Sequence, residues 1–230
     1  MKELPADKGL KIFDINYNAT TAGPSPYPNN ERVEVFLLGC NKAASGRPCP
    51  GCFNSIIWDS SKATHSWDPI EVADAIAERT PNRYITIGGG EPLDQYEYLI
   101  PFIQRLKELG FHILMYTWRE LLQIRTNFYY FQKPHNVRYI PMDKLTELYE
   151  IYKYVDIIID GDYRQEEKLY KENTNDGFFG SIGSGNQIIW DMQDNKLKKP
   201  KIENIRHEYM RDLKGIRLDE NNKLIYIYKD

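Results

Sequence analysis

The alternation of short apolar runs with amphipathic stretches constrains the fold of this chain more than any other feature. Strands are predicted at residues 32–39, 83–90, 111–117 and 155–161, with helices between them at residues 68–79, 98–110 and 142–152. Asp68 followed by Pro69 marks the first helix start, because Asp caps helix N-termini and Pro suits the first helical position. Such alternation favours helices packed on a largely parallel sheet, and we therefore predict an α/β fold.

The chain is predicted to be a single domain. A length of 230 residues without repeats or a Pro/Gly/Ser-rich linker suits one core, which we place at about residues 32–195. Residues 119–141 are aromatic and irregular, and they are interpreted as an insertion. Residues 196–230 form a C-terminal extension, in which residues 216–228 predict a β-hairpin packed on the edge of the sheet.

Composition excludes several classes of protein. No apolar run approaches the roughly 20 residues needed to span a membrane. With 30 Lys and Arg against 33 Asp and Glu, the net charge of -3 gives no general attraction to nucleic acid. The first residues, MKELPADKGL, lack the pattern of a secretory signal, so we expect a cytoplasmic protein with reduced thiols.

All three cysteines lie in one short segment, GCNKAASGRPCPGCFN. Cys40, Cys49 and Cys52 have the spacing C-x8-C-x2-C, which lets several thiolates approach one metal centre. A four-iron four-sulfur (4Fe-4S) cluster with one iron left open suits three thiolates without an obvious fourth ligand. Tetrahedral zinc, with His65 as the fourth ligand in an interaction module, is the alternative outside enzymes.

Five segments in this order resemble the radical S-adenosylmethionine (SAM) enzymes. They are GCNKAASGRPCPGCFNSIIW, GGGEPLDQ, YTW, VDIIIDGDY and GSGNQIIWD, and the resemblance spans roughly residues 36–190. Within that superfamily the chain most resembles the activating proteins of anaerobic (class III) ribonucleoside-triphosphate reductase, because of the C-P-G-C-F-N ending and the late I-I-D-G and G-S-x-N-Q elements. The resemblance implies a partial (β/α) barrel of the radical SAM type, with the insertion and the C-terminal β extension added.

The resemblance also implies the cofactors and the site. Cys40, Cys49 and Cys52 would each hold one iron of a 4Fe-4S cluster, and the fourth iron would chelate SAM. The implied SAM-binding residues lie at the ends of the predicted strands and in the late element: Gly89, Gly90, Glu91, Tyr116, Thr117, Asp160, Ser184, Asn186 and Gln187. The absent glycine side chains would let the backbone approach the methionine moiety of SAM, whose ammonium would meet carbonyl or carboxylate acceptors.

The implied reaction is one-electron cleavage of SAM and formation of a glycyl radical on the anaerobic reductase. The implied partners are the glycyl-radical subunit of that reductase and a flavodoxin-like or other reductant. Most relatives have three residues between the first two cysteines, whereas this chain has eight. A radical SAM enzyme acting on a small molecule, similar to 7-carboxy-7-deazaguanine synthase, therefore stands as the alternative, since longer spacings are less unusual there.

Overall fold

A computed structural model of the chain describes residues 1–23, 25–119, 151, 153–167, 183–184, 187–192, 213–218 and 224–228. The predicted helix at residues 142–152 and the predicted insertion after Arg119 lie almost entirely outside these residues. The structure does not test the predicted boundaries of the core and of the extension.

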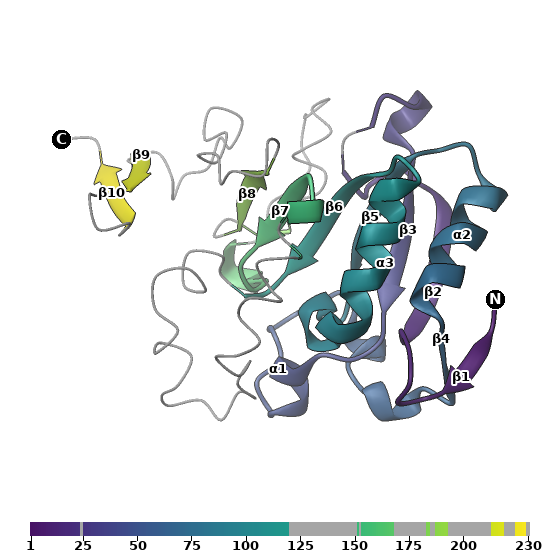
Figure 1. Ribbon diagram of the computed structural model, residues 1–230. Helices are drawn as coiled ribbons and strands as arrows, with labels where there is room; N and C mark the ends of the chain where they lie inside the picture. The colour runs from purple at the N-terminus through teal and green to yellow at the C-terminus, as the bar shows by residue number, and fades with distance from the viewer. Residues whose placement is uncertain are drawn as a thin grey trace.

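A six-stranded sheet forms the centre of the described part (Figure 1). Its order is β2-β3-β5-β6-β7-β8, with β2 at Ile12–Ala19, β3 at Arg32–Leu37, β5 at Tyr84–Gly89, β6 at His112–Thr117, β7 at Ile157–Asp160 and β8 at Ile188–Asp191. The four inner strands are parallel, and an antiparallel strand lies at each edge. The predicted α/β class with a largely parallel sheet is confirmed, and the parallel ladder places the carboxyl ends of its strands on one rim.

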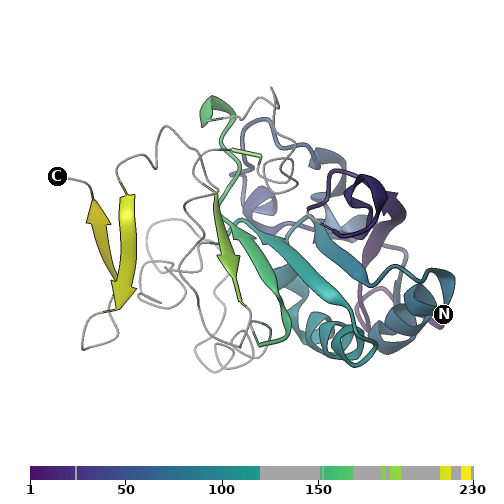
Figure 2. The ribbon, with the colours of Figure 1, turned by 90° about the horizontal axis from the view of Figure 1, so that it is seen from above.

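Two helices cover one face of the sheet. Helix α2, Pro69–Arg79, connects the cysteine segment to β5, and α3, Tyr96–Glu108, connects β5 to β6. Both helices lie on the same side of the sheet in the view from above (Figure 2). The Asp68 carboxylate accepts hydrogen bonds from the backbone N–H groups of Ile70 and Glu71, at 2.9 and 3.1 Å. The predicted N-cap is therefore confirmed.

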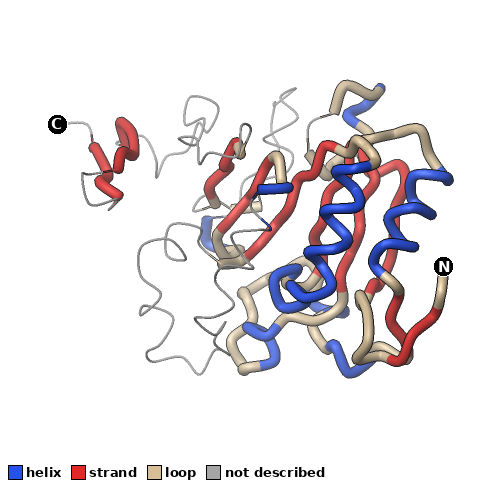
Figure 3. Tube along the Cα trace, viewed as in Figure 1, coloured by secondary structure: helices blue, strands red, loops and turns tan. Residues whose placement is uncertain are grey.

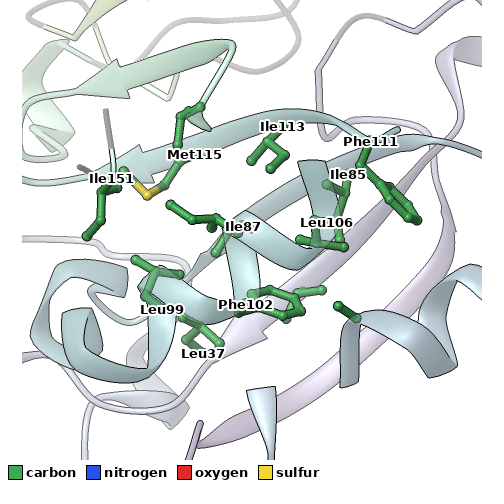
Figure 4. Packing of buried hydrophobic residues seen from close by; sticks show 14 of the residues in the cluster. Leu37, Ile85, Ile87, Leu99, Phe102, Leu106, Phe111, Ile113, Met115 and Ile151 are labelled. Atoms are coloured by element: carbon green, nitrogen blue, oxygen red, sulfur yellow. The ribbon is translucent and has the colours of Figure 1, made fainter. Parts of the chain in front are cut away.

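The hydrophobic core fills the space between these helices and the sheet. Figure 4 shows Leu99, Phe102 and Leu106 of α3 packed against strand side chains that include Ile85 and Ile87. Every second residue of β3 and β5 enters this core, as expected when a strand presents one face to helices. The core therefore fixes the register of the strands whose ends carry the sequence motifs.

The opposite face of the sheet holds a buried cation. Arg32 is fully buried, and its guanidinium donates to the Thr86 hydroxyl at 2.7 Å and to the Ile85 carbonyl at 2.6 Å. Burial lowers the pKa of Arg32 to about 10. These bonds tie β3 to β5 at the amino ends of the strands, away from the rim that carries the motifs.

Smaller elements lie outside the main sheet (Figure 3). Strands β1, Glu3–Pro5, and β4, His65–Trp67, form a two-stranded antiparallel sheet. Strands β9, Leu213–Leu218, and β10, Leu224–Tyr228, pair with each other. The predicted C-terminal hairpin is confirmed; it forms a two-stranded sheet of its own, and among the described residues β8 is the edge strand of the main sheet. The packing of the hairpin on that edge stays a prediction. In the described ranges no helix is long and apolar enough to cross a membrane.

Candidate iron-sulfur and SAM site

The cysteine loop is closed at its base by two backbone hydrogen bonds. Gly39 N donates to Ile57 O at 2.7 Å, and Cys40 N donates to Trp58 O at 2.9 Å. Gly39 follows β3 and has a φ of 104°, a conformation that favours glycine. The chain can therefore turn sharply out of the sheet, and Cys40 begins the loop at the carboxyl end of β3.

The extra residues of the loop are partly helical. Helix α1, Asn41–Ala44, starts directly after Cys40, and the Cys52 amide donates to Cys49 O at 3.1 Å in a tight turn. All three cysteines are half-buried and none is in a disulfide. The structure thus brings the three predicted ligands into one loop on the rim of the sheet.

Each of the three sulfurs accepts an N–H hydrogen bond. The donors are the backbone amides of Ala43 and Lys42 for Cys40, the Lys42 ammonium at 3.5 Å and the Tyr163 amide for Cys49, and the Trp58 indole at 3.4 Å for Cys52. Burial raises the pKa of the Cys40 thiol to about 12 and also raises the pKa of Cys49. A thiol sulfur is a weak acceptor, whereas an iron-bound thiolate carries negative charge. This donor set therefore fits a cluster held by three thiolates.

The zinc alternative fits the structure less well. Ligands of one zinc ion lie within about 4 Å of one another, since each is about 2.3 Å or less from the metal. Among the described residues, no group of three His, Cys, Asp or Glu side chains is placed to hold a single metal ion. His65 lies on β4, where its Nδ1 is 3.0 Å from Glu3 Oε1. A four-iron cluster is larger and binds each cysteine through a different iron, so its ligands need not converge on a single atom.

Gly89 and Gly90 lie directly against the start of the cysteine loop. A Cβ atom on Gly90 would be 1.9 Å from Gly39 O, and one on Gly89 would be 2.5 Å from Leu37 N and Leu37 O. Gly89 also has a φ of 105°, and Gly90 N donates to Leu37 O at 2.8 Å. The glycines are therefore required by the close approach of two backbones. Their contact with SAM stays a prediction.

Glu91 is fully buried and connects three elements. Its Oε1 accepts from Leu93 N at 3.0 Å and from the Thr117 hydroxyl at 2.8 Å, and its Oε2 accepts from Trp118 N at 3.0 Å. Burial raises the pKa of Glu91 to about 7, and the nearby Arg119 opposes that shift. The carboxylate caps the short helix η4, Pro92–Gln95, and joins it to the end of β6. Glu91 thus has a structural role that the sequence did not indicate.

Asp94 and Arg119 form a second connection beneath the loop. Asp94 Oδ2 accepts from Asn41 N at 2.6 Å, and its Oδ1 accepts from Arg119 at 2.8 Å. The Arg119 side chain is 4% exposed. Asp94 therefore holds the residue that follows Cys40, and Arg119 holds Asp94. No spacing rule pairs these two residues, so sequence reasoning missed them and placed Arg119 in the insertion.

Asn54 and Lys42 are two further residues that connect the cysteine loop to neighbouring segments. The Asn54 amide donates to Gly89 O at 3.0 Å, so the segment after Cys52 is attached to the Gly-Gly-Glu element. Lys42 Nζ lies 2.6 Å from Asp162 Oδ2. In the sequence, the role of Asn54 was indicated only by its position in the C-P-G-C-F-N element. The role of Lys42 was indicated only by its position between Cys40 and Cys49.

The late elements meet each other beside the loop. Gln187 Nε2 donates to Gly161 O at 3.0 Å, and the Ser184 hydroxyl accepts from Arg164 N at 3.1 Å. Asp160 is buried at the end of β7 and is paired in register with Thr117 of β6. Tyr116 is half-buried on the same strand end as Thr117. Asn186 lies outside the described residues.

A cavity of about 780 Å³ opens beside Cys40. Its lining includes Cys40, Asn41, Trp58, Asp94 and Tyr96, from the cysteine loop and from the start of α3. The base of the cysteine loop therefore borders this cavity.

The fold and this loop define an α/β protein built to hold an iron-sulfur cluster. Residues 30–190 match the family described as a 4Fe-4S single cluster domain, and the chain belongs to that family. The match confirms the predicted 4Fe-4S cluster, and it agrees with the SAM cofactor and the radical SAM class implied by the sequence resemblance. The assignment of Cys40, Cys49 and Cys52 as its ligands stays a prediction.

A crystal structure of QueE from Escherichia coli is similar at 17% identity and a TM-score of 0.33, over 50% of this chain and 52% of that one. The matched part thus spans about half of QueE, and a likeness this distant adds nothing on activity. No curated protein matches the chain.

Proposed function

We propose that this protein is a radical SAM activating enzyme that generates a glycyl radical on anaerobic ribonucleoside-triphosphate reductase. The observation that carries the proposal is the meeting of the motif segments at one place. The late elements contact each other through Gln187 and Gly161, and they contact the cysteine loop through Lys42 and Asp162. Segments that are more than 100 residues apart in the sequence thus build one site, as expected if the resemblance to the activating proteins reflects a shared active site.

When bound, the cluster and SAM supply reductive cleavage of a SAM carbon-sulfur bond, which yields methionine and a 5'-deoxyadenosyl radical able to abstract a hydrogen atom. The chain contributes ligands and orientation. Cys40, Cys49 and Cys52 would hold three irons, while the Asp94 carboxylate fixes the backbone amide that follows Cys40. Glu91 and Thr117 keep the ends of β5 and β6 together beside the cluster loop.

An apolar surface beside Cys52 supports a protein substrate. Phe53 and Ile56 are 67% and 66% exposed, although both are large hydrophobic residues. Exposed apolar side chains next to a functional loop suit contact with a macromolecule better than contact with a small polar substrate. We therefore place part of the reductase interface at Phe53 and Ile56.

The first experiment tests the cofactor chemistry. The protein is purified without oxygen and reconstituted with iron and sulfide, and iron content and 5'-deoxyadenosine release are measured with SAM and dithionite. We expect about four irons per chain and product release, both lost in Cys52→Ala. Stoichiometric zinc without SAM cleavage would contradict the proposal and favour a zinc-binding module.

The second experiment tests the partner. The reconstituted protein is incubated with SAM, dithionite and the glycyl-radical subunit, and the radical is measured by electron paramagnetic resonance. We expect a glycyl signal that falls about tenfold in the double variant Phe53→Ser, Ile56→Ser, the effect of losing about 1.4 kcal/mol of binding, with SAM cleavage unchanged. Ile70→Ser, at a 47% exposed position of α2, is the matched control.

The small-molecule alternative is favoured by the eight residues between Cys40 and Cys49. It predicts SAM cleavage without a glycyl signal, together with turnover of the substrate of 7-carboxy-7-deazaguanine synthase. That pair of results would replace the proposed partner while leaving the cofactor chemistry intact. Cytoplasmic location and the flavodoxin-like reductant remain predictions.

A further inference from the structure

Lys42 bridges the cysteine loop and the segment that follows β7. It is the second of the eight residues between Cys40 and Cys49 and lies on α1. Its Nζ is 3.5 Å from Cys49 Sγ and 2.6 Å from Asp162 Oδ2. The Lys42 side chain is 16% exposed and the Asp162 side chain 31% exposed. One ammonium therefore contacts both a predicted iron ligand and a partly buried carboxylate.

Neighbouring groups hold this arrangement in place. Lys42 Nζ lies 5.3 Å from the centre of the Trp118 ring, within the range of a cation-π interaction. Asp162 Oδ1 also accepts from Arg164 Nε at 3.4 Å. The ammonium is thus held between an aromatic ring, a carboxylate and a sulfur. A mobile surface lysine lacks such a set of contacts.

Lys42 also differs in charge from the other sulfur donors. The other sulfur donors named above are backbone amides and the Trp58 indole, which are neutral. Hydrogen bonds with an ionised donor are about twice as strong as neutral ones. Cys49 therefore accepts from a cation, whereas the donors named for Cys40 and Cys52 are neutral.

We propose that Lys42, supplied by the enlarged C-x8-C loop, raises the reduction potential of the cluster and that Asp162 limits this effect. Reduction adds one electron from an external donor to the cluster, so the cluster and its thiolates become more negative by one charge. A cation hydrogen-bonded to one of those thiolates stabilises the reduced form, because hydrogen bonds and charge near the sulfurs set the potential of such clusters. The carboxylate beside the ammonium offsets part of that stabilisation.

The proposal rests on the 4Fe-4S cluster of the family and does not depend on the identity of the substrate. It also gives a physical account of the unusual spacing. A helical turn placed directly after Cys40 carries Lys42, and the loop that follows it brings Cys49 within 3.5 Å of the Lys42 ammonium. The enlarged loop thus places a charge beside one of the predicted cluster ligands.

The test is a redox titration of the reconstituted protein with dithionite and mediators, followed by electron paramagnetic resonance, without SAM or partner. Lys42→Met removes the charge and the donor, and we expect the equilibrium constant for one-electron reduction to fall about tenfold, which corresponds to about 59 mV toward more negative potential. Asp162→Asn leaves the ammonium unopposed and is expected to shift the potential in the opposite direction. Lys42→Arg keeps the charge and should stay near the wild-type value.

Lys62→Gln is the matched control, because Lys62 is an exposed lysine of the short helix η3, Ser60–Lys62. Iron content is measured for every variant. An unchanged potential in Lys42→Met with iron retained overturns the proposal, as does a shift of both variants in the same direction. If Lys42→Met fails to take up iron, Asp162→Asn decides, and the absence of a positive shift there rejects the proposal. Failure here would leave SAM cleavage and glycyl radical formation untouched, so the two proposals are tested separately.

Discussion

The Thr117 hydroxyl donates to the buried Glu91 carboxylate at 2.8 Å. Glu91 follows β5 and Thr117 ends β6, so this bond joins two neighbouring parallel strands at the rim that carries the cysteine loop. Thr117 Oγ1 also accepts from Arg119 N at 3.1 Å. One hydroxyl therefore connects the Gly-Gly-Glu element to the residue that holds Asp94.

Thr117→Val should destabilise the protein by about 1.5–3 kcal/mol, because it removes a donor from a buried carboxylate while keeping the side-chain shape. The free energy of unfolding is measured by urea denaturation. Thr64→Val, at an exposed position, is the control and should change stability by less than about 0.5 kcal/mol. Equal effects of the two substitutions would mean that the Glu91 bond contributes nothing of its own.

Gly90→Ala should disrupt the cysteine loop. The added Cβ would be 1.9 Å from Gly39 O, so the backbone that leads into Cys40 must move. We expect a loss of about 2 kcal/mol or more of stability, typical of steric overpacking, and reduced iron content after reconstitution.

Gly88→Ala is the control for this steric argument. Its Cβ would meet the Tyr116 ring at 3.5 Å, an ordinary contact distance. Gly88→Ala should therefore keep both iron content and stability near wild type. Normal iron uptake by Gly90→Ala would show that the two backbones can separate without loss of the site.

Asp94→Asn should cost about 3–5 kcal/mol of stability, since it leaves the buried Arg119 cation without its carboxylate. Asp74→Asn is the comparison, because Asp74 pairs with Arg105 at the surface, where both side chains are more than one third exposed. An exposed pair contributes about 0–1 kcal/mol. Thermal and urea unfolding of both variants measure the difference. A similar cost at the two positions would contradict the role assigned to the buried pair.

The Glu34 carboxyl predicts a pH dependence of stability. Burial on β3 raises the pKa of Glu34 to about 7 from its ordinary value of 4.5. The folded state therefore binds this proton more tightly than the unfolded state, and stability falls as the pH rises from about 4.5 to about 7. Glu34→Gln should be more stable than wild type by about 1–2 kcal/mol at pH 8, after allowance for partial exposure.

The two proteins should converge in stability below about pH 4.5, where Glu34 is protonated in both the folded and the unfolded state. Urea unfolding at several pH values gives this curve. Glu78→Gln, at an exposed position of α2, serves as the control. A constant difference between wild type and Glu34→Gln across the whole pH range would show that the carboxyl keeps its ordinary pKa.

Local signals in the sequence were sufficient for most of the parallel core. Asp68 and Pro69 marked the start of α2, and Gly110, the last residue of the predicted helix 98–110, has a φ of 81° and lies two residues after the end of α3. The edge strands β2 and β8 were not predicted. Strand β2 is half-exposed and interrupted by irregular register, so it lacks a clean alternation of apolar and polar residues.

The site could be predicted as a set of residues, but its connections could not. The three cysteines were evident from their spacing. The need for a glycine at position 90 was not evident from the sequence. It arises because Gly39, 51 positions earlier, lies against Gly90 across a strand pairing. The Asp94 and Arg119 pair likewise joins residues that only the tertiary structure brings together. Sequence patterns report local conformation well, whereas these contacts arise from the packing of β3, β5 and β6.

Two backbone hydrogen bonds, from Gly39 to Ile57 and from Cys40 to Trp58, fix both ends of the cysteine loop. The geometry of the sheet therefore does not depend on the length of the loop. Once the entry and exit of a loop are fixed, lengthening it is inexpensive, and a doubling costs about 0.6 kcal/mol in closure entropy. Residues 44–48 can therefore be lengthened, shortened or exchanged at low cost while Asn41, Lys42 and Ala43 keep the contacts described above. Such a scaffold allows cysteine spacing to diverge, and it offers protein engineers a place to graft new charges beside a metal cluster without rebuilding the fold.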